Sequence, residues 1–242
     1  MDATLQTILV IFAACAGAFS QSAFGFGSPA ISMPLITMMA GLNIATPLVA
    51  MVLLVTNIVI VASDWRQIEF KAVWRVLLAT ILSLPLGLLL VIYVPMDVGV
   101  KILGVLLIVF GLYFLMPLKL PYLQGAFWDV VWGVLAGVVG AAYNFTGLPV
   151  IIYYAMRRWS PARFRATLSG YFLPSTAAIF ISHIVAGFWT PQIIRLAWMT
   201  LPFVLVTIAI GSWLNHRLEA KKFQFALALL VTAMGILILL RS

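Results

Sequence analysis

The chain has 242 residues, of which 64% are hydrophobic and only 8% are charged. A soluble domain carries about a quarter charged residues, so the composition excludes an ordinary soluble protein and predicts an all-α, polytopic membrane protein. The net charge of +8 does not indicate nucleic-acid binding. The basic residues stand in short clusters between apolar runs, as in membrane proteins, and not in one patch on a soluble module.

Ten apolar segments follow one another along the chain: 5–23, 29–42, 46–63, 76–94, 101–116, 129–142, 148–156, 165–187, 196–214 and 222–240. A membrane-spanning helix needs about 20 residues. The segments on either side of "FGFGSP" and of "YNFTGLP" are too short to cross alone, except for the first segment of the chain. We therefore expect two broken, re-entrant helical hairpins, each followed by three spans.

The first break contains two glycines and a Ser-Pro pair. Gly25 and Gly27 permit a tight turn and let a ligand approach the backbone. Ser28 followed by Pro29 is typical of an N-cap before the first residue of a helix. The second break offers Gly147 before the matching helix. The pattern therefore predicts that each break ends one short helix and begins another.

The second half of the chain repeats the first. At an offset of 120, Gly17, Gly27 and Pro29 match Gly137, Gly147 and Pro149. At an offset of 124, Trp65, Lys71, Trp74, Gly87 and Gly111 match Trp189, Arg195, Trp198, Gly211 and Gly235. Glycine, tryptophan and basic residues do not recur in register through apolar composition alone. We expect a single membrane domain, 1–242, built from repeats 5–117 and 126–241.

The basic residues predict that the two repeats are inverted, because cytoplasmic loops collect Lys and Arg. If each broken region returns to the side from which it came, one side receives eleven of them: Arg66, Lys71, Arg75, Lys119, Arg157, Arg158, Arg163, Arg165, Arg217, Lys221 and Lys222. The other side receives Lys101, Arg195 and Arg241. If each broken region crossed the membrane once, the two sides would instead receive eight and six basic residues. The inverted arrangement puts both termini outside the cytoplasm, on the periplasmic side of a bacterial inner membrane.

Backbone freed from a helix is tolerated at membrane depth only where protein buries it or where it lines a wet cavity. In an inverted repeat, the two breaks would meet near the midplane, the usual place of a secondary transporter's substrate site. Each would aim a helix N-terminus, with its free N–H groups and partial positive charge, at an anion. The candidate substrate-binding residues are Ser20, Gln21, Ser22, Gly25, Phe26, Gly27, Ser28, Thr56, Asn57, Tyr143, Asn144, Thr146, Gly147, Ser175 and Thr176.

The glycine-containing breaks "GFGSP" and "NFTGLP", the basic Trp-containing loop and the two-fold repeat resemble the TauE/SafE family of sulfite exporters and related anion permeases. The resemblance covers nearly the whole chain, and Gly25, Gly27 and Gly147 carry the match to the family's glycines. It implies transport of sulfite, a sulfonate or another small sulfur or organic anion across a bacterial inner membrane. Alternating access is the mechanism that we expect of such a transporter.

Charged residues add little to the candidate site. No Asp or Glu falls within a predicted span, so coupling to a proton or to sodium stays open. Arg163 and Arg165, at the start of a span, are candidates for attracting anions to a cytoplasmic vestibule. His183 is expected to be an interfacial or hydrogen-bonded histidine, and the alternative is a role as a proton carrier. Cys15 is the single cysteine, which gives no disulfide and no cysteine-based metal site.

An enzyme is not expected. No nucleophile with a base, paired buried acids or metal cluster can be assembled from the sequence, and we predict no cofactor and no bound metal. The expected partners are a small anionic substrate and the lipid bilayer, with no nucleic acid. The oligomeric state is open. Two alternatives remain: a non-transporting membrane scaffold subunit, and a channel or transporter for a solute that is not an anion.

Overall fold

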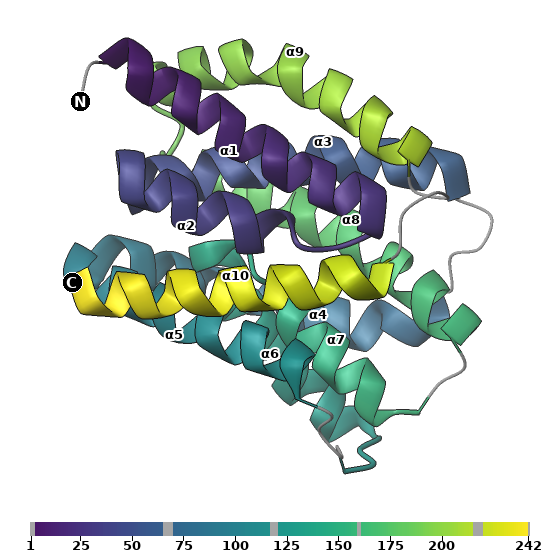
Figure 1. Cartoon of the computed structure of the whole chain (residues 1–242). Coiled ribbons are helices and arrows are strands. Elements are labelled where there is room, and N and C mark those ends of the chain that lie inside the picture. The colour runs from purple at the N-terminus through teal and green to yellow at the C-terminus, as the bar shows by residue number, and fades with distance from the viewer. Residues whose placement is uncertain (1–2, 65–69, 117–120, 159–160, 215–219, 242) are drawn as a thin grey trace.

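The structure is a computed structural model, and it describes residues 3–64, 70–116, 121–158, 161–214 and 220–241. The helices (Figure 1) are α1 (Ala3–Phe24), α2 (Ser28–Ala40), α3 (Leu42–Asp64), α4 (Phe70–Tyr93), α5 (Met96–Leu115), α6 (Ala126–Tyr143), α7 (Gly147–Met156), α8 (Pro161–Val185), α9 (Pro191–Leu214) and α10 (Ala220–Arg241). Each of the ten predicted segments corresponds to one helix, and no strand occurs in the described ranges. The all-α prediction is confirmed.

Seven of the described helices are long and apolar enough to cross a membrane, so the chain is a multi-pass membrane protein. The two helices that follow the breaks are much shorter. α2 has 13 residues and α7 has 10, which corresponds to about 20 and 15 Å at the rise of an α-helix. Neither reaches across a hydrocarbon core of about 30 Å.

The expected length of the helix before the second break is wrong. The segment 129–142 was expected to be too short to cross, whereas α6 has 18 residues and is among the helices long enough to span. The sequence interpretation started the segment at its only acidic residue, Asp129. The helix instead begins at Ala126 and holds Asp129 in its first turn. A negative charge is favourable there, because the N-terminus is the positive end of the helix dipole.

The halves of the chain interlock. α4 packs along α6 and α9 packs along α1, while α5 packs on α10 and α3 on α8. Gly87 and Gly211 lie at the first two contacts: a Cβ on Gly87 would meet Val138 O of α6, and one on Gly211 would meet Ser22 of α1. Small residues of this kind let membrane helices approach closely.

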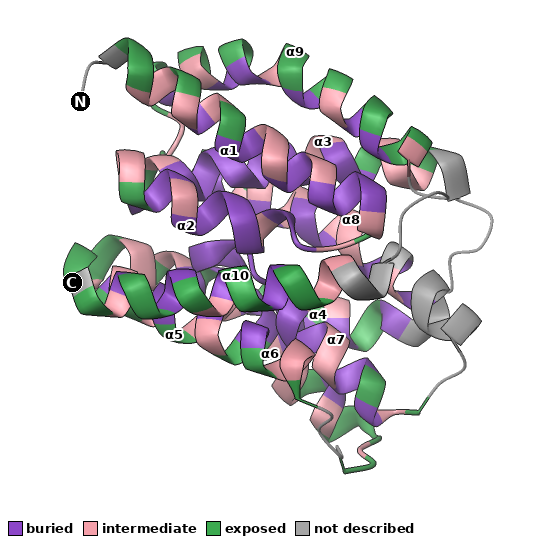
Figure 2. Cartoon of the chain, in the orientation of Figure 1, coloured by how far each residue is buried: buried purple, intermediate pink, exposed green. Residues whose placement is uncertain are grey.

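Burial separates central from peripheral helices. In α3, 61% of the candidate membrane span is buried, whereas in α9 the figure is 28%. Figure 2 shows α2 and α3 largely in the colour of buried residues, while α9 presents exposed residues outward. The start of α1 and the end of α10 lie at the same end of the helix bundle (Figure 1). The polar residues considered below therefore lie on or beside the best-buried helices.

Candidate functional site

The first break is built from two glycines with left-handed backbones. α1 ends because Gly25 adopts φ +83°, with its N–H donating to Gln21 O at 2.7 Å. Gly27 adopts φ +98° and precedes α2, and its carbonyl accepts from Ile31 N–H at 3.2 Å. A Cβ on Gly27 would also lie 2.6 Å from Ser20 Oγ. Only glycine meets both requirements at this position.

The capping of α2 differs from the sequence prediction by one residue. Gly27, and not Ser28, is the N-cap, no side chain makes a capping hydrogen bond, and Ser28 is already helical with Pro29 after it. The left-handed turn at Gly27 directs the chain into the helix one residue early. Pro29 is still tolerated, because the N–H groups of the first turn have no intrahelical partner.

The second break is held against α3. Asn144 adopts φ +61° and ends α6, with its N–H donating to Gly140 O at 2.8 Å; asparagine is one of the few residues that tolerates this conformation. Its Nδ2 donates to Thr46 O at 2.9 Å, and Thr46 Oγ1 donates to Ala142 O at 3.1 Å. α7 then begins at Gly147.

The two breaks line one cavity. It has a volume of about 40 Å³ and is lined by Gln21, Gly25, Phe26, Gly27, Pro29, Leu53, Asn57, Phe110, Asn144, Phe145, Thr146, Gly147, Leu148, Ile151, Phe172 and Thr176. By this measure one water needs about 10–15 Å³, so the space suits a few waters or one small oxyanion. The N-termini of α2 and α7, one from each half of the chain, border the same cavity.

A chain of side-chain hydrogen bonds joins three helices beside the cavity. Gln21 Nε2 of α1 donates to Asn57 Oδ1 of α3 at 2.7 Å, and Asn57 Nδ2 donates to Thr176 Oγ1 of α8 at 3.3 Å. Thr176 Oγ1 in turn donates to Phe172 O at 2.7 Å. The polar groups are thus held in place by one another, as buried polar side chains must be.

Nine of the predicted substrate-binding residues lie in this lining: Gln21, Gly25, Phe26, Gly27, Asn57, Asn144, Thr146, Gly147 and Thr176. The other six are buried but are not among the lining residues: Ser20, Ser22, Ser28, Thr56, Tyr143 and Ser175. Five of these six donate their hydroxyl to backbone carbonyls, at distances from 2.7 to 3.1 Å. In this way these hydroxyl groups find their partners within the protein.

Sequence reasoning missed most of the apolar lining. Leu53 lies one turn before Asn57, and Phe172 one turn before Thr176, so helical spacing from the predicted polar residues was a usable signal. Phe145 lies inside the second break itself. Phe110, which comes from α5, had no local signal. The side chains of the vestibule candidates Arg163 and Arg165 lie outside the described residues.

His183 is fully buried near the end of α8 and is not among the described residues that line the cavity. Its Nε2 lies 2.8 Å from Ala141 O, and its ring packs on Phe188 with a centroid distance of 5.5 Å. The expectation of a hydrogen-bonded histidine is therefore confirmed. The imidazole ties α8 to the last turn of α6.

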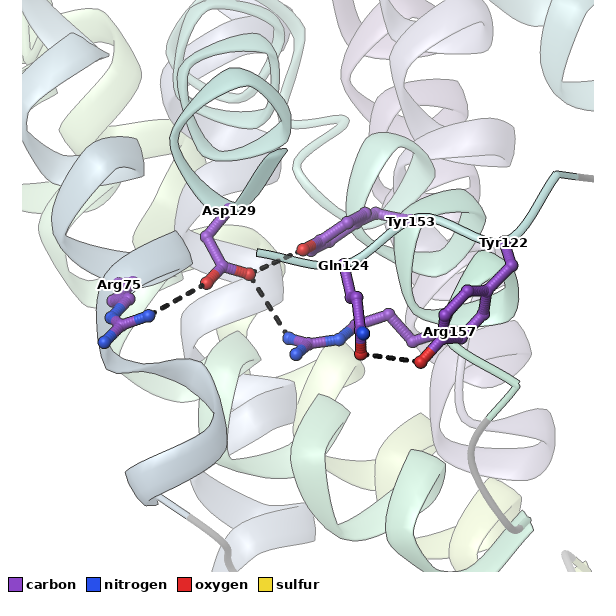
Figure 3. A network of polar contacts seen from close by, with 6 residues as sticks. All are labelled: Arg75, Tyr122, Gln124, Asp129, Tyr153 and Arg157. Carbon is purple, nitrogen blue, oxygen red and sulfur yellow. Dashed lines mark hydrogen bonds and ion pairs between the residues drawn. The ribbon is translucent and has the colours of Figure 1, made fainter. Parts of the chain in front are cut away.

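The open ends of the two hairpins are closed differently. In the first, Gln6 Nε2 of α1 donates to Met39 O of α2 at 2.6 Å. In the second, Asp129 of α6 accepts from Tyr153 Oη at 2.6 Å and pairs with Arg157 at 3.2 Å, both near the end of α7 (Figure 3). Arg75 of α4 approaches the other carboxylate oxygen at 3.9 Å.

Discontinuous helices that meet at a cavity in a multi-pass membrane protein are typical of secondary transporters. The family model for the sulfite exporter TauE/SafE matches residues 9–238. The chain therefore belongs to the TauE/SafE family and is a membrane transporter. No curated protein and no solved structure gives a match.

Proposed function

We propose that the protein carries a small anion, sulfite or a related sulfur or organic anion, through the cavity between the two breaks. One observation carries this proposal: the N-termini of α2 and α7 border the same small cavity. Each helix N-terminus offers free N–H groups and about half of a positive elementary charge. Family membership supports a small anion as the substrate.

Alternating access between two inverted repeats is the mechanism that we propose. The helix pairing supports it, because α4 on α6 is matched by α9 on α1, and α4 on α8 by α9 on α3. These are the pairs expected if α1–α5 and α6–α10 correspond in order. Rocking of one repeat against the other would expose the cavity to each side of the bacterial inner membrane in turn.

Gly25→Leu is expected to reduce sulfite transport into proteoliposomes at least tenfold, because the new side chain stands at the cavity. Gly187→Leu is the matched control. Both glycines are exposed and have positive φ, +83° and +75°, and neither has an atom within 4 Å of a new Cβ. The backbone strain, about 1–2 kcal/mol, is therefore common to both variants. Equal transport by two equally stable variants would contradict the site.

Gln21→Leu is expected to weaken transport more than Gln6→Leu does. Both glutamines are on α1, and each donates one hydrogen bond, at 2.7 and 2.6 Å. Of the two, only Gln21 lines the cavity, and its substitution leaves Asn57 Oδ1 without the donor that Gln21 Nε2 supplies. Initial rates of transport, normalised to folded protein, measure the difference. A larger loss in Gln6→Leu would indicate that hairpin closure, and not the cavity, limits transport.

A further inference from the structure

None of the described residues that line the cavity between the two breaks is Lys, Arg, His, Asp or Glu. Within this described lining, positive charge comes from the N-termini of α2 and α7, at about half an elementary charge each. Together they balance about one negative charge. A dianion would leave about one charge uncompensated in a largely apolar lining, which is strongly unfavourable.

Several polar side chains around the cavity already donate hydrogen bonds to the protein. Gln21, Asn57 and Thr176 each give a proton to a protein acceptor. A substrate therefore finds its donors mainly at the two helix N-termini and at the hydroxyl of Thr146, which also lines the cavity. The cavity offers an acceptor as well.

That acceptor is Asn144 Oδ1. Asn144 is 2% exposed and lines the cavity, and its Oδ1 has no hydrogen-bond partner among the described residues. The orientation of the amide is fixed by Thr46 O, which needs the donor Nδ2 at 2.9 Å; a flipped amide would put two acceptors together. A buried acceptor without a partner costs free energy that a donor on the substrate would recover.

We propose that the cavity selects a singly charged anion that also carries a hydrogen-bond donor, with Asn144 Oδ1 accepting that hydrogen bond. For sulfite, this is the hydrogen sulfite form and not the dianion. The inference rests on the proposed function, since it concerns the charge and protonation of the anion in the same cavity. Asn144 is then a residue that determines specificity.

Binding to the purified full-length protein, followed by calorimetry, tests the proposal with four probes. Methanesulfonate is a monoanion without a donor, hydroxymethanesulfonate is a monoanion with a hydroxyl donor, and sulfate is a dianion. Sulfite passes from hydrogen sulfite to the dianion around neutral pH. We expect hydroxymethanesulfonate to bind about fivefold tighter than methanesulfonate, the gain from one hydrogen bond, and sulfate not to bind.

Sulfite affinity should fall about tenfold for each pH unit above its second ionisation, while methanesulfonate affinity stays constant over the same range. Asn144→Gly keeps the positive φ of +61° accessible and removes the acceptor. It should abolish the preference for hydroxymethanesulfonate while leaving methanesulfonate binding. Thr46→Val, which removes the hydroxyl bond to Ala142 O but leaves the amide of Asn144, should keep the preference.

The possible failures are distinguishable. Tight binding of sulfate, or sulfite affinity independent of pH, would overturn the selection of a monoanion while leaving an anion site in place. A preference that persists in Asn144→Gly would overturn the role of Asn144. No binding of any of the four probes would overturn the proposed function itself. The wild-type measurements decide the charge question even if Asn144→Gly does not fold.

Discussion

Gly137→Leu is expected to lower the free energy of unfolding by about 3 kcal/mol or more, at the upper end of the cost of overpacking. A Cβ on Gly137 of α6 would collide with Ser83 Oγ and with Thr80 O of α4. A side-chain oxygen can rotate away, but a helical carbonyl oxygen moves only with its helix. Thermal melting of the detergent-purified protein, followed by light scattering and tryptophan fluorescence, measures the loss.

Val130→Leu provides the control on the same helix. Val130 is 49% exposed on the outer surface of α6, so an added methylene there changes stability by less than about 0.5 kcal/mol. If both variants melted at the same temperature as the wild-type protein, the close packing of α4 on α6 would be wrong.

The contact at Gly137 marks a limit of sequence reasoning. Spacing paired Gly137 with Gly17 and placed both in equivalent helices, yet Gly17 faces Ser28 and Ser32 of α2, whereas Gly137 faces α4. A repeat in the sequence identifies equivalent positions. Which helix packs against each position depends on how the packing of the two repeats differs, and a single sequence does not contain that information.

Most of the fold could be predicted because lipid imposes a simple rule on composition. Apolar segments of sufficient length must be helices, since every backbone polar group needs a partner within its own segment. The two helix ends at Gly25–Gly27 and at Asn144 were predictable for a different reason. Glycine and asparagine tolerate the left-handed backbone that such an end requires. Phe110 was not predictable, because its position in the cavity depends on the packing of α5 against distant segments.

The cavity was predictable in part. Gln21, Asn57 and Thr176 stood out as polar residues in apolar helices, and they form a connected chain beside the breaks. Ser22 and Thr56 stood out equally, but each donates its hydroxyl to a carbonyl of the preceding turn of its own helix, Ala18 O and Val52 O. Hydroxyl side chains can satisfy themselves in this way and amides cannot do so as readily. Amides are thus the better guide to a site in a membrane helix.

Asp129→Ala is expected to lower the free energy of unfolding by about 3 kcal/mol, near the lower end of the cost of breaking a buried ion pair from one side. The Asp129 side chain is 6% exposed, and Arg157, its partner at 3.2 Å, is 20% exposed. The substitution also takes the acceptor from Tyr153 Oη. Because Asp129 lies in the first turn of α6 and Arg157 directly follows α7, the network closes α6 on α7 (Figure 3).

Arg75→Ala distinguishes closure of the hairpin by Arg157 from the loss of any positive charge near Asp129. Arg75 is 51% exposed and lies 3.9 Å from the carboxylate, so its removal costs less than about 1 kcal/mol. Tyr153→Phe should fall between the two, at about 1.5 kcal/mol, as the loss of a hydrogen bond to a charged group. Thermal melting of the three variants measures the order. If Arg75→Ala proved the most destabilising, the main role of Asp129 would be to hold α6 to α4. The ion pair would then not close the second hairpin at the place where Gln6 and Met39 close the first.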